Sequence, residues 1–238
     1  MFNNNLKSVP TPPNKLGFTL AEVLITLVII GVIAAITVPS LINKTNNQET
    51  VAKLKKAYST LAQAVKLSEI DNGSTDNWDY SLSSENFYKQ YLKKYVINTK
   101  EFGYVDLESL GIKYYWPNGT EIGSGYELYG GLYRFILNDG ISIYFGNSYD
   151  TFRALYVDIN GAKKPNKMGK DLFVFSIQKD YKFTPYGFGN SNQSFGTVAN
   201  RDVLKGTNSH ACAKDKYGFW CAALIMTDSW QIKSDYPI

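Results

Sequence analysis

An uninterrupted apolar stretch near the N-terminus constrains this chain more than any other feature. Residues 18–38 read FTLAEVLITLVIIGVIAAITV, with Glu22 as the single charged side chain. A helix of this length extends roughly 30 Å, the thickness of a bilayer's hydrocarbon core. A secretory signal peptide usually has a shorter apolar region of about 7–15 residues that ends at a small-residue cleavage site, whereas Pro39-Ser40 follows this one. The stretch therefore predicts a membrane-spanning helix, and a buried core helix is the alternative.

Glu22 stands out within this stretch. A carboxylate at the bilayer centre costs on the order of 2.5–3.5 kcal/mol on insertion scales, so such residues usually have a partner. Glu22 lies only one turn from the start of the stretch, from where its side chain can reach the interface. The alternative interpretation is a surface glutamate at an ordinary helix end.

The residues before the stretch predict a segment that is removed. Residues 1–17 are polar, contain three prolines and two lysines, and end in Lys15-Leu16-Gly17. Such a sequence forms no stable helix and has nothing to bury in a core. Charge alone does not orient the membrane helix, because lysines lie on both sides of it: Lys7 and Lys15 before it, and Lys44, Lys53, Lys55 and Lys56 after it.

The junction Gly17-Phe18-Thr19-Leu20-Ala21-Glu22 resembles the processing signal of type IV prepilins and type II secretion pseudopilins. That signal has Gly before the cut, Phe after it and Glu at the fifth mature position. The resemblance implies that a prepilin peptidase cleaves between Gly17 and Phe18 and methylates the new amine of Phe18. The mature chain would have 238 − 17 = 221 residues.

The same resemblance implies a role in filament assembly. The Glu22 carboxylate would meet the Phe18 amine of a neighbouring subunit and set its register, and Pro39 would kink the helix. The implied partners are other pilin or pseudopilin subunits, the prepilin peptidase, membrane lipid, and an inner-membrane platform with its ATPase, because the chain lacks a phosphate-binding loop. The N-terminus would be cytoplasmic and the head extracytoplasmic. A minor pilin whose head acts as an adhesin or DNA-binding receptor is the alternative.

The pattern divides the chain into four parts. Residues 1–17 are a leader, 18–38 the transmembrane and assembly helix, 39–72 the amphipathic half of the same helix, and 73–238 a globular head. The amphipathic half has apolar residues at spacings of three and four: Val51, Leu54, Tyr58, Leu61 and Val65. Gly73 is placed to end the helix.

The head has the pattern of a helix followed by an antiparallel sheet, which makes the expected fold class α+β and pilin-like. A short helix is expected over 84–95 with Ser84 as its N-cap. Strands are expected over 113–116, 132–137, 141–145, 154–159 and 172–177. Asn138-Asp139-Gly140 is a hairpin turn signal, and Pro117-Asn118-Gly119 is a second turn.

One loop offers oxygen ligands. Residues 157–171 read VDINGAKKPNKMGKD and resemble a loop in many prepilin-like proteins. Asp158, Asn160 and Asp171 supply the hard oxygens that Ca²⁺ prefers. The loop is not an EF-hand and its lysines oppose a cation, so a rigid connector with Asx-type turns is the alternative, with no cofactor at all.

The cysteine and histidine content excludes several kinds of site. Cys212 and Cys221 are the only cysteines and His210 the only histidine, too few for a zinc site of the usual kind. In an oxidising compartment the two cysteines would form a disulfide, as the resemblance to pilins also implies, and two free thiols in a cytosolic protein are the alternative. A Cys–His or serine triad would need His210 as its base, so we expect no enzyme.

Basic and aromatic residues also alternate over 179–183 and 214–217, a pattern that can contact single-stranded DNA. Acidic residues lie among them, which argues against nucleic acid as a partner. Tyr-rich loops are also normal at protein interfaces.

Overall fold

The computed structural model describes residues 17–123, 126, 128, 132–149, 152–179, 182–188 and 200–238. The predicted leader lies outside these residues except for Gly17. The chain divides into two compact units, Met1–Thr45 and Asn46–Ile238.

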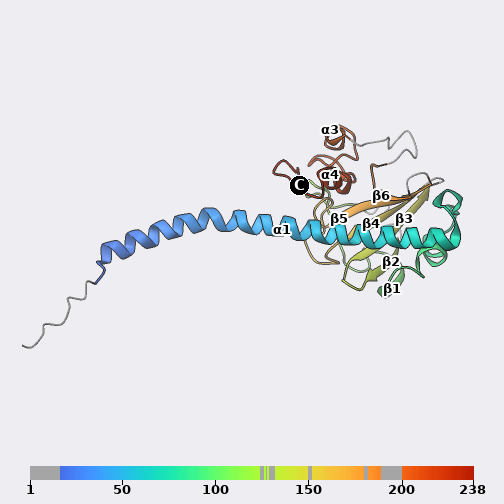
Figure 1. Cartoon of the computed structure of the whole chain (residues 1–238), viewed down its shortest axis with the longest axis horizontal. Coiled ribbons are helices and arrows are strands. Elements are labelled where there is room, and N and C mark those ends of the chain that lie inside the picture. Colours follow the sequence, from blue (N-terminus) through green and yellow to red (C-terminus); the bar gives the residue numbers. More distant parts are fainter. Residues whose placement is uncertain are drawn as a thin grey trace, which may run out of the picture. The chain divides into compact units, whose positions relative to one another are not determined.

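Helix α1 (Leu20–Asn72) contributes to both units and is coloured blue to cyan in Figure 1. In the first unit, every described residue is exposed except the half-buried Ala34. Pro39 lies inside the helix and has no N–H to donate, which removes one bond of the helical ladder. The helix ends as predicted, because Gly73 adopts a φ of 77° that favours glycine.

The second half of α1 packs on the sheet of the second unit. Leu54, Leu61 and Val65 of the predicted stripe are buried, while Val51 and Tyr58 are half-buried. The ring of Tyr58 stacks on two phenylalanines of the sheet, with centroids 6.1 Å from Phe175 and 5.7 Å from Phe183. The amphipathic pattern thus identified the face that contacts the core.

The sheet is antiparallel and its six strands follow one another in chain order. The strands are β1 (Asn98–Val105), β2 (Leu132–Leu137), β3 (Ser142–Tyr149), β4 (Phe152–Asp158), β5 (Leu172–Gln178) and β6 (Lys182–Pro185). The α+β class is confirmed, and so are four of the expected strands, now β2 to β5. β1 and β6 were not expected: Lys100, Glu101 and Gly103 interrupt the first, and the second has only four residues and ends at Pro185.

The expected strand over 113–116 is wrong. In this segment Tyr115 makes only isolated bridges, to Glu121 and Lys167. These residues lead instead into the turn at Pro117-Asn118-Gly119, in which Gly119 donates its N–H to the Trp116 carbonyl at 2.9 Å.

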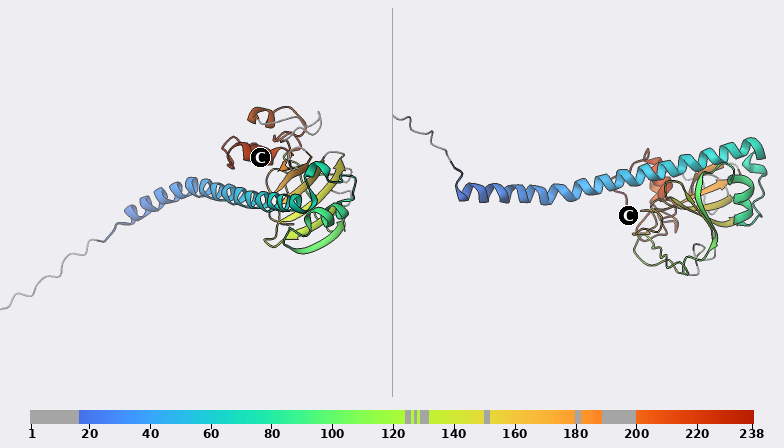
Figure 2. Two further views of the ribbon diagram at one scale, coloured as in Figure 1. Left: turned by 45° about the vertical axis from the view of Figure 1, so that its right-hand side comes forward. Right: turned by 90° about the horizontal axis from the view of Figure 1, so that it is seen from below.

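Both faces of the sheet are covered. All seven residues of β4 and all seven of β5 are buried, although their side chains alternate between faces. One face packs against α1. The other packs against loops, since the Tyr114 and Tyr144 rings meet at 6.2 Å and those of Tyr156 and Phe219 at 6.3 Å. Figure 2 shows the helix on one side of the sheet and the long green loop segment on the other.

The short helix after α1 differs from its prediction. It comprises α2 (Ser84–Phe87) and a π-helical turn over Tyr88–Leu92. Its N-cap is Ser83 rather than Ser84, because the Ser83 side chain accepts the hydrogen bond from the Asn86 N–H. Buried Arg153 of β4 fixes this segment: its guanidinium donates to the Leu82 carbonyl at 2.6 Å and lies 4.5 Å from the Phe87 ring.

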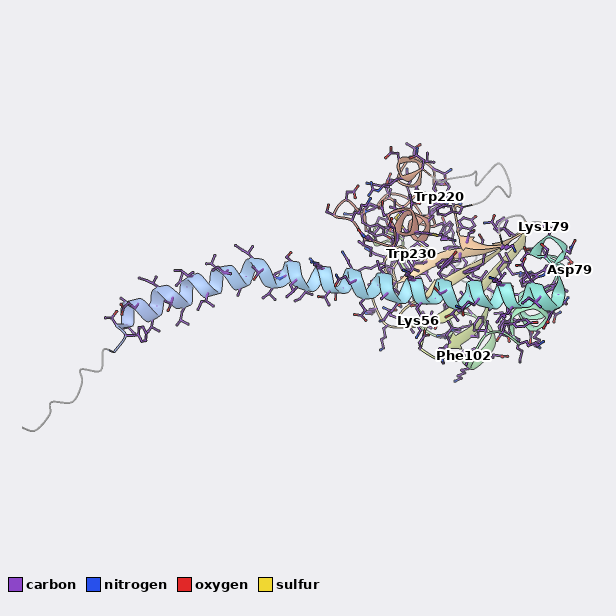
Figure 3. The ribbon with its side chains drawn as sticks, viewed as in Figure 1. Lys56, Asp79, Phe102, Lys179, Trp220 and Trp230 are labelled. Atoms are coloured by element: carbon purple, nitrogen blue, oxygen red, sulfur yellow. A yellow bond between two sulfur atoms is a disulfide. The ribbon has the colours of Figure 1, made fainter. Side chains whose placement is uncertain are left out.

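The C-terminal segment carries α3 (Arg201–Leu204) and α4 (Cys221–Thr227), neither of which was expected. It includes Trp220 and Trp230, both marked in Figure 3. Trp230 packs on Tyr58 of α1 with ring centroids 5.3 Å apart. Arg201 joins the segment's two ends through ion pairs with Asp228 and Asp235, at 2.8 and 2.5 Å.

Candidate functional site

The residues at the predicted processing junction form a helix N-terminus. Thr19 precedes the first residue of α1, and its backbone N–H and hydroxyl both donate to the Glu22 carboxylate at 2.8 Å. In return, the Glu22 N–H donates to the Thr19 hydroxyl oxygen at 3.2 Å. This reciprocal arrangement is a capping box, and it satisfies two backbone donors that a helix start leaves free.

Thr19 is a hydrogen-bond partner of Glu22 that the sequence interpretation missed. The signal was present, because a capping box reads Thr-x-x-Glu and the sequence has Thr19-Leu20-Ala21-Glu22. Gly17 and Phe18 precede this cap and are exposed. The junction is therefore accessible in an extended segment just before the helix.

The apolar stretch has no partner within its own unit. Its large side chains are exposed, for example Leu24 at 54%, Val28 at 64% and Ile36 at 70%. By length and composition, α1 is the one helix among the described residues that could cross a membrane. Because none of the apolar window is buried, the alternative of a core helix is not supported.

The candidate calcium residues do lie together, at the end of β4 and the start of β5. Asp158 and Asp171 are both buried. The Asn160 N–H donates to the Asp158 carboxylate at 3.1 Å, which is an Asx-type turn. The other Asp158 oxygen accepts from the Tyr114 hydroxyl at 2.6 Å, and that hydroxyl lies 3.0 Å from the Tyr144 hydroxyl.

Asp171 is satisfied in the same way. One of its oxygens accepts from the Asn166 N–H at 2.7 Å and the Asn160 side-chain amide at 3.1 Å, and the other accepts from the Lys167 N–H. Hydrogen-bond donors thus occupy the carboxylate oxygens of Asp158 and Asp171, whereas the side-chain oxygens of Asn160 and Asn166 are buried without a hydrogen-bond partner. Ca²⁺ needs six to eight oxygens that face the ion. The paired carboxylates favour the rigid connector, the unpaired amide oxygens favour a ligand, and the cation site stays a prediction. Among the described residues, no group of three or more His, Cys, Asp or Glu could hold a metal.

Burial dominates the electrostatics of this connector. It raises the pKa of Asp158 to about 7, although the hydrogen bonds from Tyr114 and Asn160 oppose the shift. It raises the pKa of Asp171 as well, against its backbone donors, and it raises the pKa of Tyr114 well above the usual tyrosine range. Below about pH 7 the Asp158 carboxyl is therefore mostly protonated, whereas a solvent-exposed aspartate loses its proton near pH 4.

The two cysteines form a disulfide between Cys212 and Cys221, and both are buried. Gly169 of the connector lies against this bond and has a φ of 78°. A Cβ added at Gly169 would lie only 2.7 Å from the Cys221 sulfur, so there is no room for a side chain. The disulfide thus packs directly on the Asp158–Asp171 connector. His210 lies beside the loop, and burial lowers the pKa of its imidazole.

Two lysines of the basic and aromatic segments have acidic partners. Lys182 pairs with Glu69 of α1 at 2.9 Å and Lys216 pairs with Asp215 at 3.0 Å, so both charges are compensated locally. Asp180 and Tyr181 lie outside the described residues.

Comparison with known proteins divides the chain at nearly the same place as its pattern does. Residues 40–238 match a family described as "Family of unknown function (DUF6613)". The chain belongs to the DUF6613 family. Residues 12–38 match the prokaryotic N-terminal methylation motif, the prepilin-type cleavage and methylation signature. No curated protein and no solved structure matches this DUF6613 protein.

The methylation motif confirms the resemblance to prepilins. It makes this DUF6613 protein pilin-like, and it implies processing by a prepilin peptidase and assembly with other pilin subunits. A single apolar N-terminal helix is consistent with a single-pass inner-membrane anchor.

Proposed function

We propose that this DUF6613 protein is a structural subunit, a pilin or pseudopilin, of a type IV pilus or a type II secretion pseudopilus. Prepilin peptidase removes residues 1–17 and methylates Phe18. The subunit waits in the inner membrane with its head outside the cytoplasm until an assembly platform and its ATPase move it into the filament. The methylation motif at residues 12–38, on a helix that exposes its apolar side chains, carries this proposal.

The physical basis is that the N-terminal helix lacks a core of its own. Its exposed side chains find an apolar environment first in lipid and then among the same helices of other subunits. Small residues at Gly31, Ala34 and Ala35 let such helices approach closely. Contacts that pair different surfaces of identical subunits leave each end open for the next one, so growth continues along a helix.

Glu22 sets the register between neighbouring subunits rather than the strength of their binding. Its carboxylate is held at the helix start by Thr19, where the helix dipole also favours a negative charge. The amine that cleavage creates at Phe18 of a neighbour would be attracted to this fixed carboxylate. Desolvation offsets much of the attraction between two buried charges, so the pair determines position more than affinity.

The test is filament entry of subunits that carry a changed Glu22. We expect Glu22→Ala to be cleaved and membrane-inserted but recovered in sheared filaments at roughly one tenth of the wild-type yield or less. Glu22→Asp should be intermediate, since it keeps the charge and shortens the reach. Glu49→Ala is the matched control, because Glu49 is an exposed carboxylate on the same helix that pairs with Lys53 at 2.7 Å.

Fractionation of filaments against membranes separates the possible results. A wild-type filament yield from Glu22→Ala refutes the pairing role. Loss of this variant from the membrane instead assigns Glu22 to insertion, and an uncleaved precursor assigns it to recognition by the peptidase.

A further inference from the structure

An aromatic pocket lies on the loop-covered face of the sheet and has no part in assembly through the N-terminal helix. Its volume is about 220 Å³. Trp116 forms one wall with two tyrosines, since its ring centroid lies 4.8 Å from those of both Tyr126 and Tyr217. Phe219 and His210, whose centroids are 5.3 Å apart, line the side towards the disulfide, and Tyr156 of β4 forms the floor.

Both walls are held in place by bonds that exist without a ligand. The Trp116 N–H donates to the Thr120 carbonyl at 2.8 Å, and Trp116 starts the turn that Gly119 closes. Tyr217 and Phe219 lie between the two cysteines, so the disulfide fixes the loop that presents them. A preformed site loses less conformational entropy when it binds a ligand.

The charge of the lining selects an uncharged ligand. None of the described residues that line the pocket is an acid, a lysine or an arginine. Burial lowers the pKa of His210, which keeps its imidazole neutral near pH 7. A charged group that entered would lose its hydration without gaining a counter-ion. In the chain, lining residues adjoin charges of both signs, Lys167 and Lys216 as well as Glu121 and Glu127, so the neighbours favour neither a cation nor an anion.

The arrangement of apolar rings and polar hydroxyls in the pocket favours a ligand with one apolar face and a polar edge. The rings of Tyr126 and Tyr217, packed on buried Trp116, provide apolar faces, while their two hydroxyls share a 3.5 Å hydrogen bond at the outer edge. Tyr126 is 40% exposed, so this edge is open to solvent. The volume is below the 300 Å³ or more of pockets for drug-sized ligands, so it suits a single ring.

We infer that the pocket bounded by Trp116, Tyr126 and Tyr217 binds one neutral pyranose ring of a carbohydrate. The C–H face of the sugar would stack on the phenol rings of Tyr126 and Tyr217, which buried Trp116 supports from behind, as aromatic side chains with polar tips allow. Its hydroxyl groups would hydrogen-bond to the tyrosine hydroxyls and the imidazole at the edge. The contact area is that of one ring, so we expect affinities in the millimolar range.

The inference is tested on the full chain in a detergent without a sugar headgroup, such as an amine oxide. Quenching or enhancement of tryptophan fluorescence is followed on titration with methyl glycosides of glucose, galactose and N-acetylglucosamine. We expect saturable binding of at least one of them, weakened tenfold or more by Tyr126→Ala. Tyr104→Ala is the matched control, because Tyr104 is a tyrosine of similar exposure (51%) on β1 and should leave binding unchanged.

Tyr217→Phe separates stacking from hydrogen bonding, since it keeps the ring and removes one hydroxyl; we expect it to weaken binding by a smaller factor of about three. Thermal melts of each variant check that the head is folded. No binding of any of the three glycosides overturns the inference, and so does equal binding by Tyr126→Ala. Tighter binding of tetramethylammonium or of an indole probe, with the same loss in Tyr126→Ala, would replace the sugar by a cationic or aromatic ligand. None of these results depends on filament entry.

Discussion

The two halves of α1 belong to one helix and follow opposite rules. Up to Thr45, its apolar side chains are exposed, whereas from Leu54 to Ser68 those that face the sheet are buried within the chain. Buried residues recur every three or four positions in the second half, and the first half is apolar all round. An all-round apolar helix is stable only if its environment is apolar on every side. The first half therefore suits contact with lipid or with other subunits, whereas the second half suits contact with this chain's own core.

Polar groups follow the same division. In the first half, the hydroxyls of Thr26 and Thr37 donate to the carbonyls of Val23 and Ile33, both at 2.9 Å within the helix. Such local bonds leave no hydroxyl in need of water. In the head, polar side chains reach across the fold, as Tyr114 does to Asp158. A sequence change should therefore affect either assembly or folding of the head, according to the half that it touches.

The largest expected effect is on processing. Gly17→Val should abolish cleavage, because the peptidase by resemblance requires a residue without a side chain at the cut, and less than about a tenth of the protein should start at Phe18. N-terminal mass analysis measures this. The head should keep its disulfide and melting temperature. An intact mature N-terminus at Phe18 in this variant would contradict the assigned site.

The next effect compares two leucines of α1. Leu61 is 1% exposed and Leu41 is 65% exposed. Leu61→Ala should destabilise the head by about 2–5 kcal/mol, since it leaves a cavity, and lower the melting temperature by roughly 10 °C. Leu41→Ala should leave the head's unfolding temperature unchanged. Calorimetry of both variants measures this difference. Equal melting temperatures would contradict the assignment of opposite roles to the two halves of α1.

The disulfide should contribute less. Replacing both Cys212 and Cys221 by Ala should destabilise the head by about 2–3 kcal/mol, because a loop of roughly ten residues is no longer closed in the unfolded chain. Processing and membrane insertion should be unaffected. In protein from the native host, alkylation without prior reduction should label neither cysteine, and two labelled thiols would contradict an extracytoplasmic head.

A pH effect should come from Asp158. Its folded-state pKa of about 7 lies above the usual aspartate value, so the folded head binds a proton between about pH 4 and 7 that the unfolded chain has released. This carboxyl therefore makes stability fall as pH rises through that window. Even a third of the shift in the Asp158 pKa corresponds to a change of about 1.4 kcal/mol in the free energy of unfolding.

The measurement compares the melting temperature of wild type and Asp158→Asn at pH 5 and pH 8. The variant keeps an oxygen for the Tyr114 hydroxyl and cannot ionise, so its stability relative to wild type should rise with pH. A constant difference between the two proteins would show that the Asp158 carboxyl does not titrate in this range.

The smallest expected effect is that of calcium. Since donors already occupy the carboxylates of Asp158 and Asp171, 1 mM Ca²⁺ should change the melting temperature of the head by less than about 1 °C relative to EDTA. The matched variant Asp171→Asn distinguishes binding at this loop from binding elsewhere. A stabilisation by Ca²⁺ that Asp171→Asn removes would restore the cation site.

The sequence by itself determined the features that depend on local order along the chain. The apolar stretch, the Gly17-Phe18 junction, the buried stripe at Leu54 and Leu61 and the β2–β3 hairpin are all readable in short windows, because helix period, strand alternation and turn chemistry act over a few residues. The capping box of Thr19 and Glu22 was equally local and could have been predicted.

Only the tertiary structure decided features that join distant segments. It placed Tyr114 on Asp158, 44 residues away in the chain, and so gave one candidate ligand a hydrogen-bond donor that the loop's own sequence does not contain. It also brought Trp116 against Tyr217 to form the aromatic pocket. β1 and β6 became strands because neighbouring strands offered unpaired backbone groups, and that demand is absent from their own sequences. Which residues meet across a sheet depends on register and packing of the whole head, and no local pattern encodes it.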